Sequence, residues 1–188
     1  MTKFEIFFEG HTSLKLPLRS FITKACPSVG GRLTIRLGKN KSETIKDFLR
    51  AIGEGPAALM VLLIDSDAPD NGSLLQEVMK TPLWREHAPK KPPRPHVHWM
   101  VQVMESWFVA DEHALRSYYK KNFKPKALPK HKNVEAIAKS QVLKALSRAT
   151  GGKYDKVSHA ARILERLDPH KVRNRAGSCD RFLRFIAS

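Results

Sequence analysis

Two aspartates close an otherwise apolar stretch of this sequence, and their spacing is the first feature that could support chemistry. Residues 58–67 read ALMVLLIDSD, so Asp65 and Asp67 end a run that favours a buried strand. Residues i and i+2 of a strand point to the same side, and the two carboxylates therefore project together if the extended backbone continues. Neighbouring carboxylates repel and raise each other's pKa unless a cation lies between them. The alternative is a turn in which the aspartates cap a following helix.

Glutamates follow two other segments that have the pattern of strands. Glu9 directly follows the stretch KFEIFF and is followed by Gly10, and Glu105 follows VHWMVQVM. Ligands of a parallel sheet bind at the carboxyl ends of the strands, so we expect these acids to meet Asp65 and Asp67 at one edge. Mg²⁺ is commonly held by one or two carboxylates and keeps water or substrate phosphate at its other positions. The acids of this edge therefore suit Mg²⁺, or Mn²⁺ in its place.

The elements that must position these acids alternate along the chain. Strand patterns at 3–8, 32–37, 58–65 and 97–104 are separated by segments with helical spacing. This alternation is typical of a parallel α/β sheet with right-handed crossovers. We therefore expect an α/β fold with a Rossmann-like, mostly parallel central sheet flanked by helices. Helices are expected at 13–26, from an N-cap at Ser42 to Gly53 or Gly55, and at 73–80, 105–119, 133–148, 156–167 and 179–187, with a loop at 86–96.

Length and composition indicate one globular unit. The chain has 188 residues, a mass of 21.3 kDa and a hydrophobic share of 41%, which is enough for a core. No segment has the ~18 consecutive apolar residues of a membrane span, and the N-terminus lacks the regions of a signal peptide. Cys26 and Cys179 are too few for a disulfide framework or a Cys-only zinc site. These features predict a soluble cytoplasmic protein without a membrane partner.

The formal net charge of +16 is concentrated in the second part of the chain. Residues 1–112 carry 15 basic and 13 acidic side chains, whereas residues 113–188 carry 19 basic and 5 acidic ones. We expect an α/β core over 1–112 and a basic helical part over 113–188, packed together as a single unit. A basic segment attracts polyanions, with nucleic acid as the first candidate and a membrane surface or an acidic partner as the next, and the alternative is a solvated surface. The basic helix positions expected to follow phosphates include Lys139, Lys144, Arg148 and Arg162.

A strand-ending Glu-Gly with a later Asp-x-Asp resembles the Toprim domain, the metal-binding fold shared by topoisomerases, primases and several nuclease families. FFEG supplies the first motif and LLIDSD the second. VMESWFVADEHALRSYY resembles the Glu-x-Trp helix of small Toprim-like proteins encoded beside ABC-type ATPases, which include the overcoming-lysogenization-defect nucleases and their phage-defence relatives. With the late block YDKVSHAARILERLDPHKVR, residues 4–186 resemble the Toprim-like family called domain of unknown function 4276.

The resemblance implies a Toprim-like sheet and a role for each acid. It makes Glu9 a metal ligand or general base, and Asp65 and Asp67 metal ligands, the latter through water. Glu105 would complete the site or bind a second metal. Related nucleases often carry another acid a few residues after the Glu-Gly, where this chain has Ser13. That departure favours a single ion, or a site that binds without cutting.

Roles for three other residues follow from the same resemblance. Lys156 and His159, near the start of a helix in the basic part, would contact the scissile phosphate. Gly10 would let the backbone turn tightly beside the ion. The implied activity is Mg²⁺-dependent hydrolysis of phosphodiester bonds in DNA or RNA, with an ABC- or AAA-type ATPase partner, in anti-phage defence.

Three groups of residues suggest other chemistries, each with a simpler structural explanation. His96-x-His98 with His87 suggests zinc, which would need more ligands than a histidine pair offers. Trp99 and Trp107 suggest base stacking, but tryptophans on strands and helices are more often core anchors. Tyr118 and Tyr119 suggest a topoisomerase nucleophile, which would need further domains.

Three functions therefore remain open. The first is the nuclease, the second a catalytically inactive Toprim-like adaptor that binds nucleic acid or the ATPase, and the third a phosphatase-like or nucleotide-binding protein. The sequence leaves open the choice between DNA and RNA and whether the chain forms a homo-oligomer.

Overall fold

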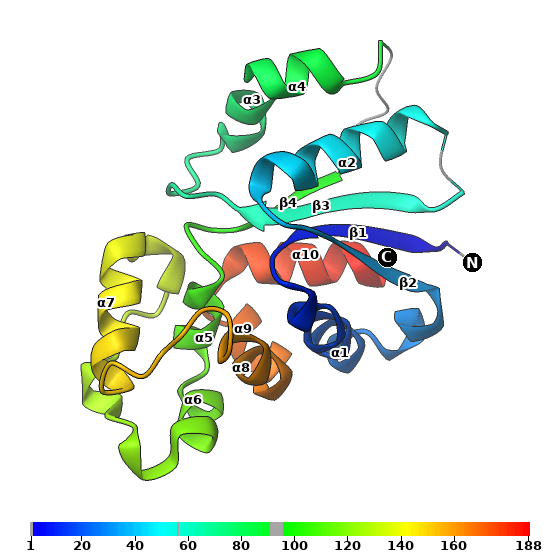
Figure 1. Cartoon of the computed structure of the whole chain (residues 1–188). Helices are drawn as coiled ribbons and strands as arrows, with labels where there is room; N and C mark the ends of the chain where they lie inside the picture. Colours follow the sequence, from blue (N-terminus) through cyan, green and yellow to red (C-terminus); the bar gives the residue numbers. More distant parts are fainter. Residues whose placement is uncertain (1, 56, 91–95) are drawn as a thin grey trace.

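A four-stranded parallel sheet forms the centre of the protein (Figure 1). The computed structural model describes residues 2–55, 57–90 and 96–188. In this part of the chain the strand order is β2-β1-β3-β4, and every neighbouring pair runs parallel. The predicted α/β fold with a parallel central sheet flanked by helices is therefore confirmed. The strands are β1 (Phe4–Glu9), β2 (Leu33–Gly38), β3 (Leu59–Asp65) and β4 (His96–Met100).

Helices cover both faces of the sheet, and its two inner strands are apolar nearly throughout for that reason. Helix α2 (Lys41–Gly53) packs on one face, and α1 (Lys15–Ala25) and α10 (Gly177–Ala187) pack on the other (Figure 1). The side chains of β1 alternate between the two layers. Phe7 joins the core beneath α2, whereas Ile6 and Phe8 join the larger core beneath α1 and α10.

The helices that follow β4 extend this larger core. It connects Phe4 and Phe8 of the sheet with Leu146, Ile163 and Phe182 of the basic part. No helix in the described ranges is long and apolar enough to cross a membrane. The remaining helices are α3 (Leu74–Met79) and α4 (Pro82–His87) before β4, and α5 (Glu105–Ala110), α6 (Glu112–Tyr119), α7 (Lys139–Ala149), α8 (Ala160–Arg166) and α9 (Pro169–Arg173) after it.

Two predicted elements end early, each near a polar residue. The strand predicted at 97–104 stops at Met100, because the backbone turns at Gln102, which has a φ of 62°. The helix predicted at 105–119 breaks at the buried Asp111. The carboxylate of Asp111 accepts hydrogen bonds from the first backbone N–H groups of α6 and so starts a new helix there.

The start of α2 also differs from its prediction. Asn40, and not Ser42, is the N-cap, because its side chain accepts a hydrogen bond of 2.9 Å from the backbone N–H of Glu43. The helix ends at Gly53 as predicted. Two other predicted helices are shorter than expected: 133–148 is α-helical only from Lys139, and 156–167 only from Ala160. Helices α4 and α9 were not predicted. Residues 91–95 of the loop predicted at 86–96 lie outside the described residues.

Gly38 ends β2 where α2 crosses closely, and a Cβ there would lie 2.8 Å from the backbone N and Cα of Thr44. We therefore expect Gly38→Ala to lower the free energy of unfolding by about 1–3 kcal/mol. Gly31→Ala is the control, since a Cβ on Gly31 meets nothing within 4 Å, and it should change stability by less than about 0.5 kcal/mol. Urea denaturation measures both, and equal effects would contradict the close packing of α2 on β2.

Candidate active site at the carboxyl edge of the sheet

A cavity of about 650 Å³ opens at the edge of the sheet where β1 and β3 end. Glu9 and Asp65, the last residues of these strands, both line it, and so does Lys156 from the loop before α8. Three candidates from distant parts of the sequence therefore share one cavity. Its other walls are formed by Gly10, His11, Thr12, Leu14, Leu37, Lys39, Glu43, Met100, Met104 and Val157.

Gly10 makes the turn out of β1 into this cavity wall. Its φ is 152°, a value that residues with a side chain rarely adopt, and a Cβ would lie 2.5 Å from Cδ1 of Leu14. Its N–H donates a hydrogen bond of 3.0 Å to the carbonyl of Gly38. The tight turn beside Glu9 thus depends on the glycine.

Asp65 is the carboxylate whose ionisation the fold opposes most clearly. It is only 8% exposed, and its Oδ1 accepts a hydrogen bond of 2.8 Å from the backbone N–H of Met104. Burial raises the pKa of Asp65 to about 7; the charge of Lys156 opposes this rise, and the carboxylates of Glu105 and Glu9 add to it. A buried acid surrounded by other acids is the electrostatic setting in which a bound cation is most favourable.

Glu105 lies behind the cavity rather than in its wall. It is the first residue of α5 and is fully buried. The hydroxyl of Tyr154 donates a hydrogen bond of 2.8 Å to its Oε1, and burial raises the pKa of Tyr154, so that this donor stays protonated. Within the described part of the chain, Oε2 of Glu105 has no hydrogen-bond partner. The structure thus couples Glu105 electrostatically to Asp65 while keeping it off the cavity surface.

Asp67 does not join Asp65, because the extended backbone stops at the end of β3. Its φ is 60°, and its carboxylate accepts hydrogen bonds of 2.5 Å from the ammonium groups of both Lys41 and Lys139. Partial burial raises the pKa of Asp67, but the hydrogen bonds from Lys139 and Lys41 outweigh this effect and lower it overall. Asp67 therefore forms a second group beside the cavity, which we call the Lys41–Asp67–Lys139 cluster.

Gln102 holds this cluster together and was missed by the sequence analysis. Its side chain is buried, donates to the carbonyl groups of Glu135 and Ile137, and accepts from the N–H of Lys139 at 2.8 Å. Its carbonyl accepts a hydrogen bond of 3.0 Å from the N–H of Asp67. The one available signal was an amide in an otherwise apolar strand pattern, VHWMVQVM.

The candidate nucleic-acid residues divide into two groups. Lys139 and Lys156 lie at the carboxyl edge. The charge of Lys156 opposes the rise in the pKa of Asp65, and the charge of Asp65 contributes to the raised pKa of Lys139. Lys144, Arg148 and Arg162 are exposed on α7 and α8 and form no ion pair with any described residue. His159 instead exchanges a hydrogen bond of 3.0 Å with the hydroxyl of Tyr119 and packs beside Tyr118.

The other sequence candidates are structural. The rings of His96 and His98 lie against Phe185 of α10, and Trp99 and Trp107 are buried in the core. Burial lowers the pKa of His98 to about 4. Among the described residues, no three His, Cys, Asp or Glu side chains are grouped to hold a metal ion. The zinc and base-stacking alternatives therefore gain no support.

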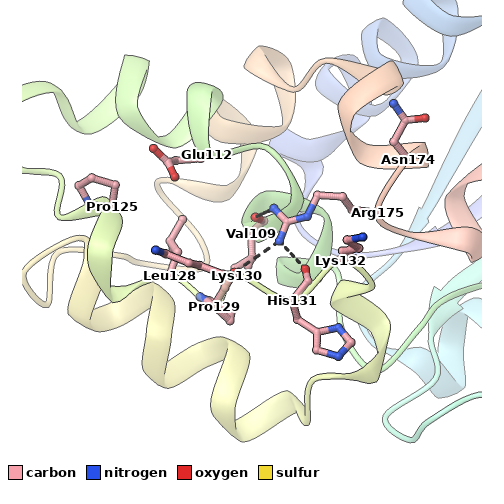
Figure 2. A pocket seen from close by; sticks show the side chains of 10 residues that line it. All are labelled: Val109, Glu112, Pro125, Leu128, Pro129, Lys130, His131, Lys132, Asn174 and Arg175. Carbon is pink, nitrogen blue, oxygen red and sulfur yellow. Dashed lines mark hydrogen bonds between the residues drawn. The ribbon is translucent and has the colours of Figure 1, made fainter.

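A second hollow of about 440 Å³ lies in the basic part (Figure 2). Arg175 enters it but donates hydrogen bonds to the carbonyl groups of Val109, Ala110, Pro129 and His131, and so joins the end of α5 to the loop near residue 130. The guanidinium group of Arg175 therefore has a structural role. The hollow is lined by Val109, Glu112, Pro125, Leu128, Pro129, Lys130, His131, Lys132, Asn174 and Arg175.

The raised pKa of Asp65 predicts a characteristic pH dependence of stability. The folded-state pKa of Asp65, about 7, lies above the ordinary 3.8. Below about pH 4 the carboxyl is protonated in both the folded and the unfolded state, so its burial costs nothing through ionisation. The free energy of unfolding then falls as pH rises from about 4 through 7. In EDTA, the stability of Asp65→Asn relative to the wild type should therefore rise between about pH 4 and pH 8, by on the order of 2–4 kcal/mol.

Urea denaturation across this range measures the difference. Asp70→Asn is the control, because Asp70 pairs with Arg181 at the surface at 2.9 Å and its variant should show a much smaller change. A pH-independent difference for Asp65→Asn would contradict the burial of an ionisable carboxyl.

Comparison with known proteins identifies the family but no characterised relative. Residues 11–187 match the family model described as Domain of unknown function (DUF4276). A search of the curated proteins and a search of the solved structures each gave no significant match. The family match begins directly after Gly10 and covers the rest of the cavity, including Asp65 and Lys156. The chain therefore belongs to the DUF4276 family.

Proposed function

We propose that this protein is a Mg²⁺- or Mn²⁺-dependent nuclease of Toprim type that hydrolyses phosphodiester bonds of DNA or RNA. The observation that carries the proposal is the buried carboxyl of Asp65, which faces the same cavity as Glu9 and Lys156. Perturbed carboxyls at the carboxyl edge of a parallel sheet are typical of catalytic sites.

The residues fit a divalent cation of the Mg²⁺ class. Glu9 and Asp65 supply two carboxylates from neighbouring strands to one cavity, and Mg²⁺ needs no more than one or two because it keeps water or substrate phosphate. The elevated pKa of Asp65 marks a buried carboxylate whose charge Lys156 compensates only in part. When bound, the ion would lower the pKa of a water molecule and neutralise charge on the scissile phosphate.

The chain's own groups would prepare the site for this chemistry. The backbone N–H of Met104 orients the carboxylate of Asp65, and Tyr154 orients Glu105 behind it. The ammonium group of Lys156 would bind a non-bridging phosphate oxygen and stabilise the negative charge that develops there. Glu9 would hold the ion or accept a proton from the attacking water.

The substrate class follows from the charge of the basic part. Residues 113–188 carry 14 more basic than acidic side chains, and cations of α7 and α8 are exposed. Such a surface suits the backbone of a nucleic acid better than a small phosphomonoester. The ATPase partner and the role in phage defence belong to the proposal through the family resemblance alone, and the cytoplasmic location through the composition of the sequence.

The second candidate is a catalytically inactive adaptor that binds nucleic acid or the ATPase. It is favoured by Asp67, which is neutralised by two lysines, and by Ser13, which stands where related nucleases often carry an acid. The side chain of Ser13 interacts with Nδ1 of His11 at 3.0 Å and offers no carboxylate.

Cleavage assays with labelled DNA and RNA in Mg²⁺ or Mn²⁺ distinguish the two candidates. We expect metal-dependent cleavage, and a loss of at least about 100-fold in Glu9→Gln and Asp65→Asn, because each removes a carboxylate that would hold the ion. Glu54→Gln, at the exposed end of α2, is the matched control and should retain the wild-type rate.

Two results would refute the nuclease. The first is a wild-type protein that cuts neither DNA nor RNA in either metal. The second is cleavage that persists undiminished in both Glu9→Gln and Asp65→Asn, since the activity would then come from elsewhere.

A further inference from the structure

The Lys41–Asp67–Lys139 cluster brings the first residues of two helices to one carboxylate. Lys41 begins α2 and Lys139 begins α7, and their ammonium groups contact different oxygens of Asp67, Oδ2 and Oδ1, each at 2.5 Å. The three side chains remain partly exposed, at 29%, 40% and 49% for Lys41, Lys139 and Asp67. A solvent anion could therefore reach both ammonium groups if Asp67 left them.

The backbone of Asp67 has an uncommon conformation in this cluster. A φ of 60° is uncommon for a residue with a side chain, and Gln102, whose carbonyl accepts the N–H of Asp67, has a φ of 62°. The buried amide of Gln102 also fixes the start of α7 through the N–H of Lys139. Such positive-φ residues persist where the surroundings over-determine them, and they concentrate at functional sites.

The cluster lies next to the cavity. Asp67 follows Asp65 by two residues, and the pKa of Lys139 is raised first by its hydrogen bond to Asp67 and, in smaller part, by the charges of Asp65 and Glu105. An anion held between Lys41 and Lys139 would thus be a near neighbour of one held by Lys156.

We propose that Asp67 occupies, in the free protein, the position of a backbone phosphate of the nucleic acid, and that Lys41 and Lys139 bind this phosphate when it displaces the carboxylate. A carboxylate bridging two ammonium groups presents two oxygens as the non-bridging oxygens of a phosphodiester do. The partial positive charges at the starts of α2 and α7 favour the same anion. The inference rests on the proposed function for its ligand, and it adds Lys41 to the substrate contacts.

Asp67→Asn is the direct test, since asparagine tolerates a positive φ as well as aspartate and cannot hold two ammonium groups. Fluorescence anisotropy with labelled DNA and RNA in EDTA measures binding without cleavage. We expect Asp67→Asn to bind about five- to tenfold more tightly than the wild type, because the phosphate no longer competes with two ion pairs. The dependence of affinity on salt should become steeper.

Asp70→Asn is the matched control, because it removes the same charge only three residues from Asp67 and frees Arg181. Its effect should be smaller than that of Asp67→Asn. Adding Lys41→Met and Lys139→Met to Asp67→Asn should abolish the gain. Equal affinities for Asp67→Asn and Asp70→Asn, or a gain that survives loss of both lysines, would overturn the inference.

The double variant Lys41→Met and Lys139→Met in the wild-type background gives a second test that does not need Asp67→Asn to fold. It should bind nucleic acid more weakly than the wild type by on the order of tenfold, and Lys80→Met, from the exposed end of α3, should not. Unchanged binding by the double variant would contradict the proposed phosphate contact.

Binding and cleavage can fail separately in these experiments. A gain in Asp67→Asn without any cleavage by the wild type would sustain this inference and remove the nuclease. Cleavage that requires Glu9 and Asp65, together with an Asp67→Asn variant that behaves like Asp70→Asn, would remove this inference alone.

Discussion

The burial of one carboxyl group at the end of a strand is the constraint on which the rest of the site depends. Strand β3 is buried on both faces by helices, so the carboxyl of Asp65 at its end is desolvated. Glu9 and Glu105 are close enough to raise its pKa further. The protein offsets this burial with one backbone N–H, from Met104, and one ammonium group, from Lys156. A divalent cation would supply the charge that these two groups provide only in part.

The uneven distribution of charge along the chain becomes a spatial arrangement at this edge. The acids of the site all come from the first 112 residues, whereas Lys139, Tyr154 and Lys156 come from the basic part. Because both parts share one hydrophobic core, the cations are carried to the acids by the fold itself. Neither part contains the complete candidate site.

The sequence was informative where the structure follows regular periodicity. Apolar runs, and at 32–37 an alternating pattern, predicted the four described strands, and the rule for parallel sheets brought Glu9 and Asp65 to one edge. It failed where a hydrogen bond of one polar residue redirects the backbone. Asp67 turns away from Asp65 because its N–H bonds to Gln102, and that contact joins residues 35 positions apart, which no local pattern encodes. Asp111 likewise breaks a continuous helical pattern through local hydrogen bonds to the N–H groups of His113 and Ala114, an N-cap that the spacing of apolar residues does not reveal.

The central claim is that Glu9 and Asp65 hold one divalent cation between the ends of β1 and β3. Anomalous diffraction from crystals soaked in Mn²⁺ tests it most directly, because the scattering locates the ion without reference to any activity. We predict a single strong peak within bonding distance of both carboxylates, about 2.0–2.3 Å from their oxygens. Mn²⁺ bound only at other positions, or no ion in crystals whose cavity is open to solvent, would contradict the account.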